Sequence, residues 1–119
     1  MYDVVKIGDK EIPMLSVGAV DVFYRQIFHE DPIKLQAKDN LDAADYIELY
    51  QRMGFVMAKF VETKSKEAML ELNEDAFLDW LMELPRKDLM EAIPHIRAIY
   101  EGETFTTAEE KKKDGESTE

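Results

Sequence analysis

One uninterrupted apolar stripe constrains the fold of this chain more than any other feature. It runs through residues 46–61 at the three- and four-residue spacing of a single helix face. Asn40 or Asp42 can cap its start, which predicts a helix over about residues 42–62. A stripe of this length can touch most other elements, so we expect the helix at the centre of the fold. Its apolar members are Tyr46, Leu49, Tyr50, Met53, Val56, Met57, Phe60 and Val61.

Apolar and polar residues alternate before this helix, which predicts a β-hairpin over residues 4–15. Gly8 can open a two-residue loop because glycine tolerates positive φ, and the resulting register places Val5 opposite Ile12. Pro13 has no N–H to donate, so its strand is short or lies at an edge. A lone hairpin is marginal in water, so we expect this one to rest on the helices.

Shorter helical segments flank the long helix. The expected segments are residues 16–30, 32–35, 65–72, 73–84 and 88–100. Ser16 is positioned to cap the first, with Val17 on its inward face. Pro94 lies inside the last pattern, which predicts a kink or a split there, and Gly102 is a natural stop. The sequence therefore predicts a mainly α protein of the α+β class with a short N-terminal hairpin.

The character of the chain changes after Gly102. Residues 103–119 hold one aromatic residue and, beyond a lone alanine, no aliphatic one. Such a segment cannot bury enough apolar surface to offset its chain entropy. We therefore expect one folded helical domain over residues 1–102 and a disordered acidic tail over residues 103–119.

The composition excludes several classes of function. The 119 residues contain no cysteine, which rules out a disulfide scaffold, a thiolate metal site and a cysteine nucleophile. A formal net charge of -11 opposes binding to nucleic-acid phosphates and to anionic membrane surfaces. No apolar run approaches the roughly 18 residues of a membrane span, and a signal peptide's long apolar stretch is missing. We expect a soluble, intracellular protein with no nucleic-acid or membrane partner.

The sequence offers little for catalysis. Its two histidines, His29 and His95, fall on different expected helices, and a metal site could recruit both together with Glu30. Two partly exposed histidines near helix ends are the simpler interpretation. No nucleophile elbow, phosphate loop or dinucleotide fingerprint is present. We therefore expect neither enzyme activity nor a metal or other cofactor.

Methionine is enriched, with seven residues in the chain. Methionine is flexible and polarisable, which suits surfaces that accommodate an imperfect partner. The partner-binding candidates on the expected helices are Met53, Met57, Trp80 and Met82. The alternative is that these side chains fill the core.

A distinctive element of the form A-x-x-x-x-Y-R-x-x-F-x-x-D follows the hairpin. Its fixed positions are Ala19, Tyr24, Arg25, Phe28 and Asp31. After it come the long helix, an aromatic-rich helix ending in Trp-Leu, and a final helix with A-I-P-x-I-x-x-I-Y. In this order, over residues 4–101, the chain resembles the tail assembly chaperones of long-tailed bacteriophages and prophages of Gram-positive hosts. His29 stands where the family pattern has a glycine.

This resemblance implies a non-catalytic role. Such chaperones bind the long, helical, hydrophobic tape measure protein and keep it soluble until tail-tube subunits polymerise around it. The implied partners are the tape measure protein and the tail-tube protein, in the cytoplasm of the host bacterium, and the chaperone is absent from the mature virion. Whether the chain also associates with itself to form a homo-oligomer is not decided by the sequence. The alternative function is that of a small helical adaptor or regulatory protein that binds one defined protein partner.

Many members of this family are made in two lengths through a programmed ribosomal frameshift near the C-terminus. Lys111–Lys113 are encoded by an A-rich tract, because lysine has only the codons AAA and AAG. Such a tract favours slippage by one base. The alternative is a charged tail without recoding.

The residues themselves assign a structural role to the Y-R-x-x-F-x-x-D element. Tyr24 and Phe28 are one helical turn apart and can both pack on the long helix. Arg25 can reach Asp31 or Glu30 beyond the turn. An exposed ion pair contributes only about 0–1 kcal/mol, so packing dominates. We expect this element to fix the fold and not to form an active site.

Overall fold

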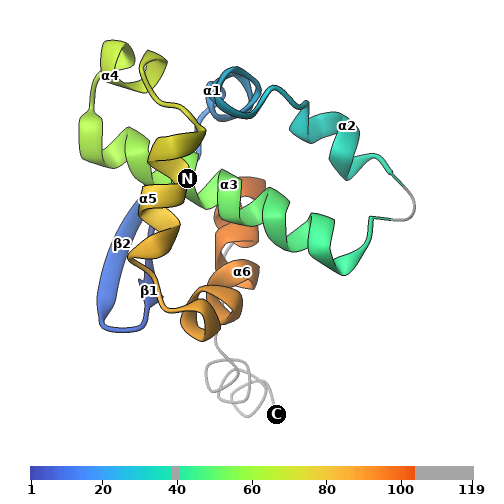
Figure 1. Ribbon diagram of the computed structural model, residues 1–119, viewed down its shortest axis with the longest axis vertical. Coiled ribbons are helices and arrows are strands. Elements are labelled where there is room, and N and C mark those ends of the chain that lie inside the picture. The colour runs from blue at the N-terminus through green and yellow to red at the C-terminus, as the bar shows by residue number, and fades with distance from the viewer. Residues whose placement is uncertain (39–40, 104–119) are drawn as a thin grey trace, which may run out of the picture.

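The computed structural model describes residues 1–38 and 41–103, and within them the chain is mainly helical with one N-terminal hairpin (Figure 1). The elements are β1 Tyr2–Ile7, β2 Lys10–Leu15, α1 Val20–Phe28, α2 Pro32–Gln36, α3 Ala43–Thr63, α4 Lys66–Leu70, α5 Glu74–Met82 and α6 Arg86–Glu101. The predicted fold class is therefore confirmed. The predicted tail, apart from Glu103, and the Lys111–Lys113 run lie outside the described residues.

The hairpin has the predicted register, with Val5 opposite Ile12 in an antiparallel pair. Gly8 opens the loop at a φ of 62°. A Cβ atom at this position would lie 2.9 Å from the carboxylate oxygen Oδ2 of Asp88, so both conformation and space favour glycine. The inner face of the two strands is buried against α3 and α6 through Val5, Ile7 and Met14. The hairpin thus rests on the helices, as expected from its marginal stability alone.

Both strands of this two-stranded sheet have an outer edge. On β2, Pro13 offers no N–H group. On β1, the N–H of Val4 donates to the Asp3 carboxylate at 2.8 Å. A proline and a satisfied donor both reduce the ability of an edge to pair with a foreign strand.

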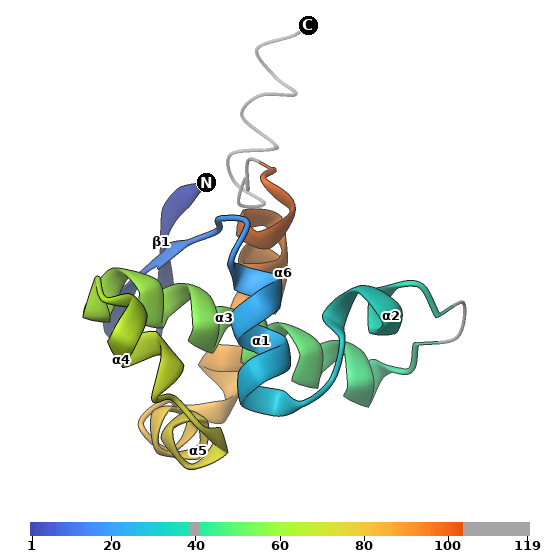
Figure 2. The same ribbon diagram turned by 90° about the horizontal axis from the view of Figure 1, so that it is seen from above.

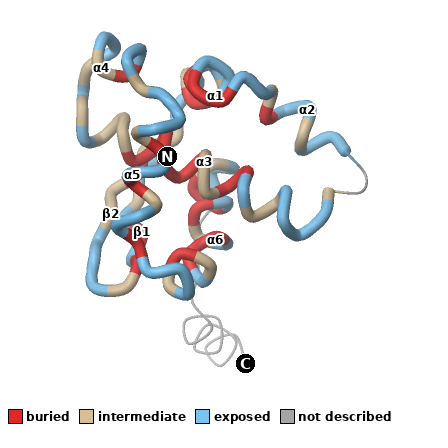
Figure 3. Tube along the Cα trace, viewed as in Figure 1, coloured by how far each residue is buried: buried red, intermediate tan, exposed pale blue. Residues whose placement is uncertain are grey.

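Helix α3 crosses the middle of the molecule, with α1 above it and α6 below it in Figure 1; Figure 2 gives the view from above. The helix is continuous through Gly54, and the Asp42 carboxylate caps it by accepting the N–H of Asp45 at 2.8 Å. The predicted central helix over about residues 42–62 is therefore confirmed. The buried residues gather where α3 meets its neighbours, as the red segments of Figure 3 show.

Side-chain caps set most of the other helix starts. The Asp31 carboxylate accepts the N–H of Ile33 at 2.9 Å and begins α2. Ser65 begins α4, and Asn73 begins α5 by accepting the N–H of Ala76 at 3.0 Å. Helix and turn boundaries in this region therefore follow from local sequence signals.

The predicted start of α1 is wrong. Ser16 does not cap this helix, which begins at Val20. Ser16 instead extends the hairpin: its N–H donates to the Met1 carbonyl at 2.8 Å, and the Met1 ammonium donates to the Ser16 carbonyl at 2.8 Å. Because the hairpin ladder reaches this far, the chain cannot turn into a helix at the same residue. Val17 is consequently exposed and not on an inward face.

Of the kink or split predicted at Pro94, the split is wrong, since α6 is one helix through Pro94. The missing N–H of a proline deprives the carbonyl four residues earlier, that of Met90, of its usual helical donor. Pro94 is exposed, so water can reach this side of the helix. Gly102 ends α6 with a φ of 74°, as predicted.

Candidate protein-binding groove

The aromatic residues of the Y-R-x-x-F-x-x-D element are buried between helices. Tyr24 is fully buried, and Phe28 is 4% exposed. The Phe28 ring lies 5.1 Å from that of Tyr24, 5.0 Å from that of Phe77 on α5 and 6.4 Å from that of Phe55 on α3. The prediction that the element packs on the long helix is therefore confirmed, and Phe28 also joins it to α5.

Arg25 and Asp31 lie at the periphery of this element. Their closest charged atoms are 3.9 Å apart, and both side chains are partly exposed. The predicted ion pair is present, but solvent screening leaves it little stabilising value.

Arg52 of α3 forms the more buried charge cluster, which the sequence interpretation missed. Its side chain is 15% exposed and pairs with Glu30 at 2.9 Å and with Glu48 one turn earlier. Its guanidinium carbon lies 4.8 Å from the centre of the Phe28 ring, and its Nη1 lies 3.5 Å from the Tyr24 hydroxyl. Burial raises the pKa of Tyr24, so this hydroxyl keeps its proton at neutral pH. The i,i+4 spacing of Glu48 and Arg52 is the only sequence signal for the cluster.

His29 ends α1 in the left-handed conformation, with a φ of 57°, and its N–H donates to the Arg25 carbonyl at 2.8 Å. This conformation favours glycine, the residue that the resembled pattern has here. Lys64 ends α3 in the same way, with a φ of 50°.

Replacing His29 with glycine is expected to stabilise the fold by about 0.5–1 kcal/mol, because a side chain in the left-handed conformation costs about 1–2 kcal/mol and glycine's larger unfolded-state entropy offsets part of the gain. Urea denaturation of His29→Gly against the parent chain measures the change. Lys64→Gly is the matched variant and should shift in the same direction. A loss of stability in His29→Gly would show that the imidazole makes a contact outweighing the strain.

A groove of about 500 Å³ opens between α3, α5 and α6. The buried rings of Phe28 and Phe77 line it. Its other apolar lining residues, all partly or largely exposed, are Ala44, Ile47, Leu78, Leu81 and Met90. Its charged and polar ones are Glu48, Gln51, Arg52, Glu74 and Arg86. Because Arg52 and Phe28 both belong to this lining, the charge cluster and the groove are one site.

The four candidate partner-binding residues lie in different places. Met53 and Met57 are fully buried on α3, so they add to the core and offer no surface in this conformation. Trp80 is nearly buried, whereas Met82 is 85% exposed on α5. Sequence reasoning missed Leu78, which lies one turn before Met82. Leu78 and Met82 are two apolar residues four positions apart that lie off the inward face of α5. This spacing is the sequence signal that could have indicated the exposed surface.

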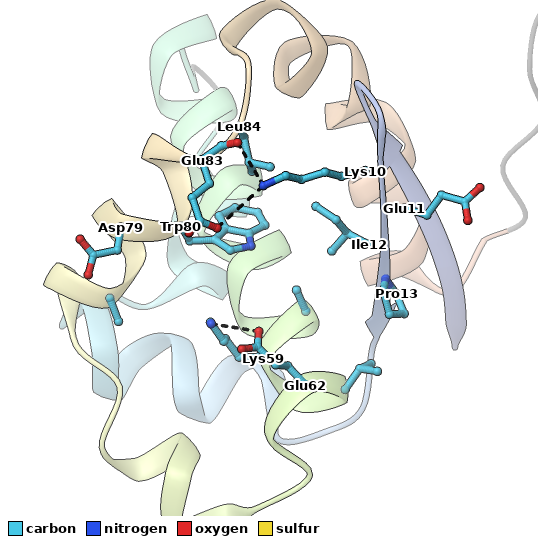
Figure 4. A pocket seen from close by; sticks show the side chains of 13 residues that line it. Lys10, Glu11, Ile12, Pro13, Lys59, Glu62, Asp79, Trp80, Glu83 and Leu84 are labelled. Atoms are coloured by element: carbon cyan, nitrogen blue, oxygen red, sulfur yellow. Dashed lines mark hydrogen bonds and ion pairs between the residues drawn. The ribbon is translucent and has the colours of Figure 1, made fainter.

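A second cleft, of about 570 Å³, separates β2 from α5 (Figure 4). Trp80 faces it, and the Lys10 ammonium reaches across it to the Glu83 carboxylate at 3.9 Å and the Glu83 carbonyl at 3.3 Å. Lys59 pairs with Glu62 at 3.0 Å on its α3 side. The charges within these two pairs satisfy each other, and the described residues that line the cleft include no nucleophile–base pair.

The two histidines are not brought together. His29 is exposed at the end of α1, whereas His95 Nε2 lies 2.8 Å from the Asp3 carboxylate. Within residues 1–38 and 41–103, no group of three or more histidine, cysteine or acidic side chains could hold a metal ion.

The Asp3–His95 contact predicts an acid-dependent loss of stability. The hydrogen bond from His95, followed by that from the Val4 N–H, lowers the pKa of Asp3. A carboxyl group with a lowered pKa stabilises the fold above its ordinary pKa and loses this effect as the pH falls through its folded-state pKa. The stability difference between the parent chain and Asp3→Asn should therefore shrink from about pH 5 to about pH 2. Chemical denaturation at several pH values measures it, and a constant difference would contradict the assignment.

Comparison with known proteins returned no matching family model, curated protein or solved structure. Among the described residues, no helix combines the length and the apolar character needed to cross a membrane.

Proposed function

We propose that this chain is a non-catalytic phage tail assembly chaperone, and that the groove between α3, α5 and α6 binds apolar helical segments of a tape measure protein. The groove itself is the observation that carries the proposal. It is a concave apolar surface made by three helices, with charged side chains around it. An amphipathic helix that places its apolar face in such a groove is a recurrent mode of protein recognition.

The side chains of the groove suit a partner of variable sequence. Met90 and Leu78 can change rotamers to fit different apolar residues, and methionine does so at low cost. Phe28 and Phe77 beneath them are held by ring contacts and by the guanidinium of Arg52. A fixed aromatic base with adaptable walls supports binding to many segments of one long partner.

The same arrangement links the groove to the resemblance. The Y-R-x-x-F-x-x-D element supplies Phe28 to the groove lining, and Glu30 of the same segment pairs with Arg52. The Y-R-x-x-F-x-x-D element, which is structural, can therefore also be needed for binding a partner in the groove. The net charge of -11 favours solubility of a complex that carries an apolar partner.

Coexpression with the tape measure protein tests the proposal. The gene of this chain is expected between a tail-tube gene and a very long tape-measure gene. The product of that long gene should be soluble with this chain and insoluble without it. Ile47→Glu combined with Met90→Glu should abolish this effect, because carboxylates would then lie in the apolar groove. Ile33→Glu, which makes the same change at an exposed site on α2, should leave the effect intact.

Two results would overturn the proposal. One is a gene with no tape-measure neighbour. The other is a failed solubility test, in which the tape measure protein stays insoluble with the parent chain, or is equally soluble with the double variant, although circular dichroism shows both chains to be folded. Specific binding to one small globular partner, with no effect on the tape measure protein, would instead favour the adaptor function.

A further inference from the structure

A second apolar groove, of about 490 Å³, lies between α1, the end of α3 and α4. Figure 2 shows α4 beside α1 in this region. The apolar residues that line this groove are Ala19, Val22, Phe23, Phe60 and Met69. Val22 is 50% exposed at its surface. The groove shares no lining residue with the one assigned to the tape measure protein.

Its charge is unusual for this chain. Acidic residues outnumber basic ones by 26 to 15, yet the only charged side chains among the described residues that line the groove are Lys64 and Lys66. Within the described part of the chain, neither lysine forms an ion pair. The surface therefore fits an apolar segment that carries carboxylates.

Helix α5 of the same protein has this chemistry on its outer side. Asp75, Leu78, Asp79 and Met82 recur at the spacing of one helix face, and all four are exposed. The helix contains three acidic residues and no lysine or arginine. Within residues 1–38 and 41–103, neither aspartate forms an ion pair.

We propose that the groove between α1, α3 and α4 binds the outer face of α5 from a second copy of this chain. Leu78 and Met82 enter the apolar groove, and Asp75 and Asp79 lie against Lys64 and Lys66. The two surfaces are different parts of the chain, so a single contact leaves one copy with a free groove and the other with a free α5, to which further copies can bind. The assembly closes as a dimer only if each of two copies binds the α5 of the other. The contact goes beyond chaperone function, because it forms in the purified chain without a tape measure protein.

Sedimentation of the full chain over a range of concentrations tests the contact. The average mass should rise above the 13.8 kDa of one chain as the concentration increases. Met82→Glu on α5 and Val22→Glu in the groove should each weaken association about tenfold or more, since each places a carboxylate in an apolar contact. Ile33→Glu is the matched control and should associate like the parent chain.

Charge reversal identifies the two surfaces. One variant carries Lys64→Glu and Lys66→Glu, and the other carries Asp75→Lys and Asp79→Lys. Each variant alone faces like charges across the contact and should stay monomeric. In a mixture, the groove of either variant faces an α5 of opposite charge on the other variant. The mixture should therefore associate.

Three outcomes would overturn the proposal. The first is a parent chain that stays at 13.8 kDa up to about 1 mM, the range of very weak affinity. The second is an equal effect of Ile33→Glu and Met82→Glu. The third is a mixture of charge-reversed variants that stays monomeric while the parent chain associates, which would place self-association on another surface. All three outcomes are measured on the purified chain without the tape measure protein. Because Leu78 also lines the groove assigned to that protein, self-association and tape measure binding compete for this side chain.

Discussion

Phe28→Ala is expected to lower the free energy of unfolding by about 3–5 kcal/mol, the range for large aromatic residues truncated in cores. The ring joins α1 to α3 and α5 through its contacts with Phe55 and Phe77, and it supports the guanidinium of Arg52. Tyr24→Ala should cost a similar amount because its side chain is fully buried. Urea denaturation followed by circular dichroism measures both variants.

Two milder variants separate packing from charge in the same element. Tyr24→Phe keeps the ring and removes only the hydroxyl that lies 3.5 Å from Arg52, so its cost should be about 1 kcal/mol or less. Arg25→Ala removes a partly exposed pair and should cost at most about 1 kcal/mol. If Arg25→Ala proved costlier than Phe28→Ala, the element would depend on its charges and the packing interpretation would be wrong.

Gly54→Leu is expected to cost about 3 kcal/mol, near the upper end for overpacking. A Cβ atom at Gly54 would lie 3.1 Å and 3.3 Å from two methyl groups of Ile96 on α6, and 3.5 Å from the terminal methyl of Met14 on β2. A single methyl group requires only a small adjustment of these flexible ends, whereas three further carbons require α3 and α6 to separate.

Gly54→Ala should therefore change stability little, because the gain of about 1 kcal/mol in helix propensity opposes the crowding. Gly18→Leu is the matched control, since nothing lies within 4 Å of a Cβ atom there. Thermal or urea denaturation of the three variants measures the order. Equal stability of Gly54→Leu and the parent chain would show that the helices can separate freely at this point.

Local signals account for the parts of the fold that the sequence predicted well. A two-residue loop fixes the hairpin register, and a long apolar stripe fixes α3, because both patterns are complete within one segment. The predicted cap at Ser16 and the predicted split at Pro94 are wrong because each depends on contacts outside its own segment. The partner that holds Ser16 in the hairpin is Met1, at the far end of the opposite strand, and the continuity of α6 through Pro94 depends on packing and on solvent exposure.

The candidate site was less predictable than the fold. The methionines of α3 form part of the same stripe that builds the core, so composition alone could not tell core filling from partner binding. Met82 and Leu78 lie on the outward side of another helix, α5, and are exposed. The groove requires three helices to meet, and the role of Arg52 requires the loop after α1 to return to α3. Both arrangements depend on contacts between segments that are distant in the sequence, so no single stretch of sequence predicts them.

The packing of β1 against α6 has a consequence for biosynthesis. Asp3 and His95, which join these two elements, are 92 residues apart. At roughly 5–20 residues per second, a ribosome needs about 5–18 s to add His95 after Asp3. During that interval Val5 and Ile7 have been synthesised without the last helix that covers them. Closure of the core is therefore a late event of translation, and a chain released before α6 leaves the inner side of the hairpin open to the contents of the cell.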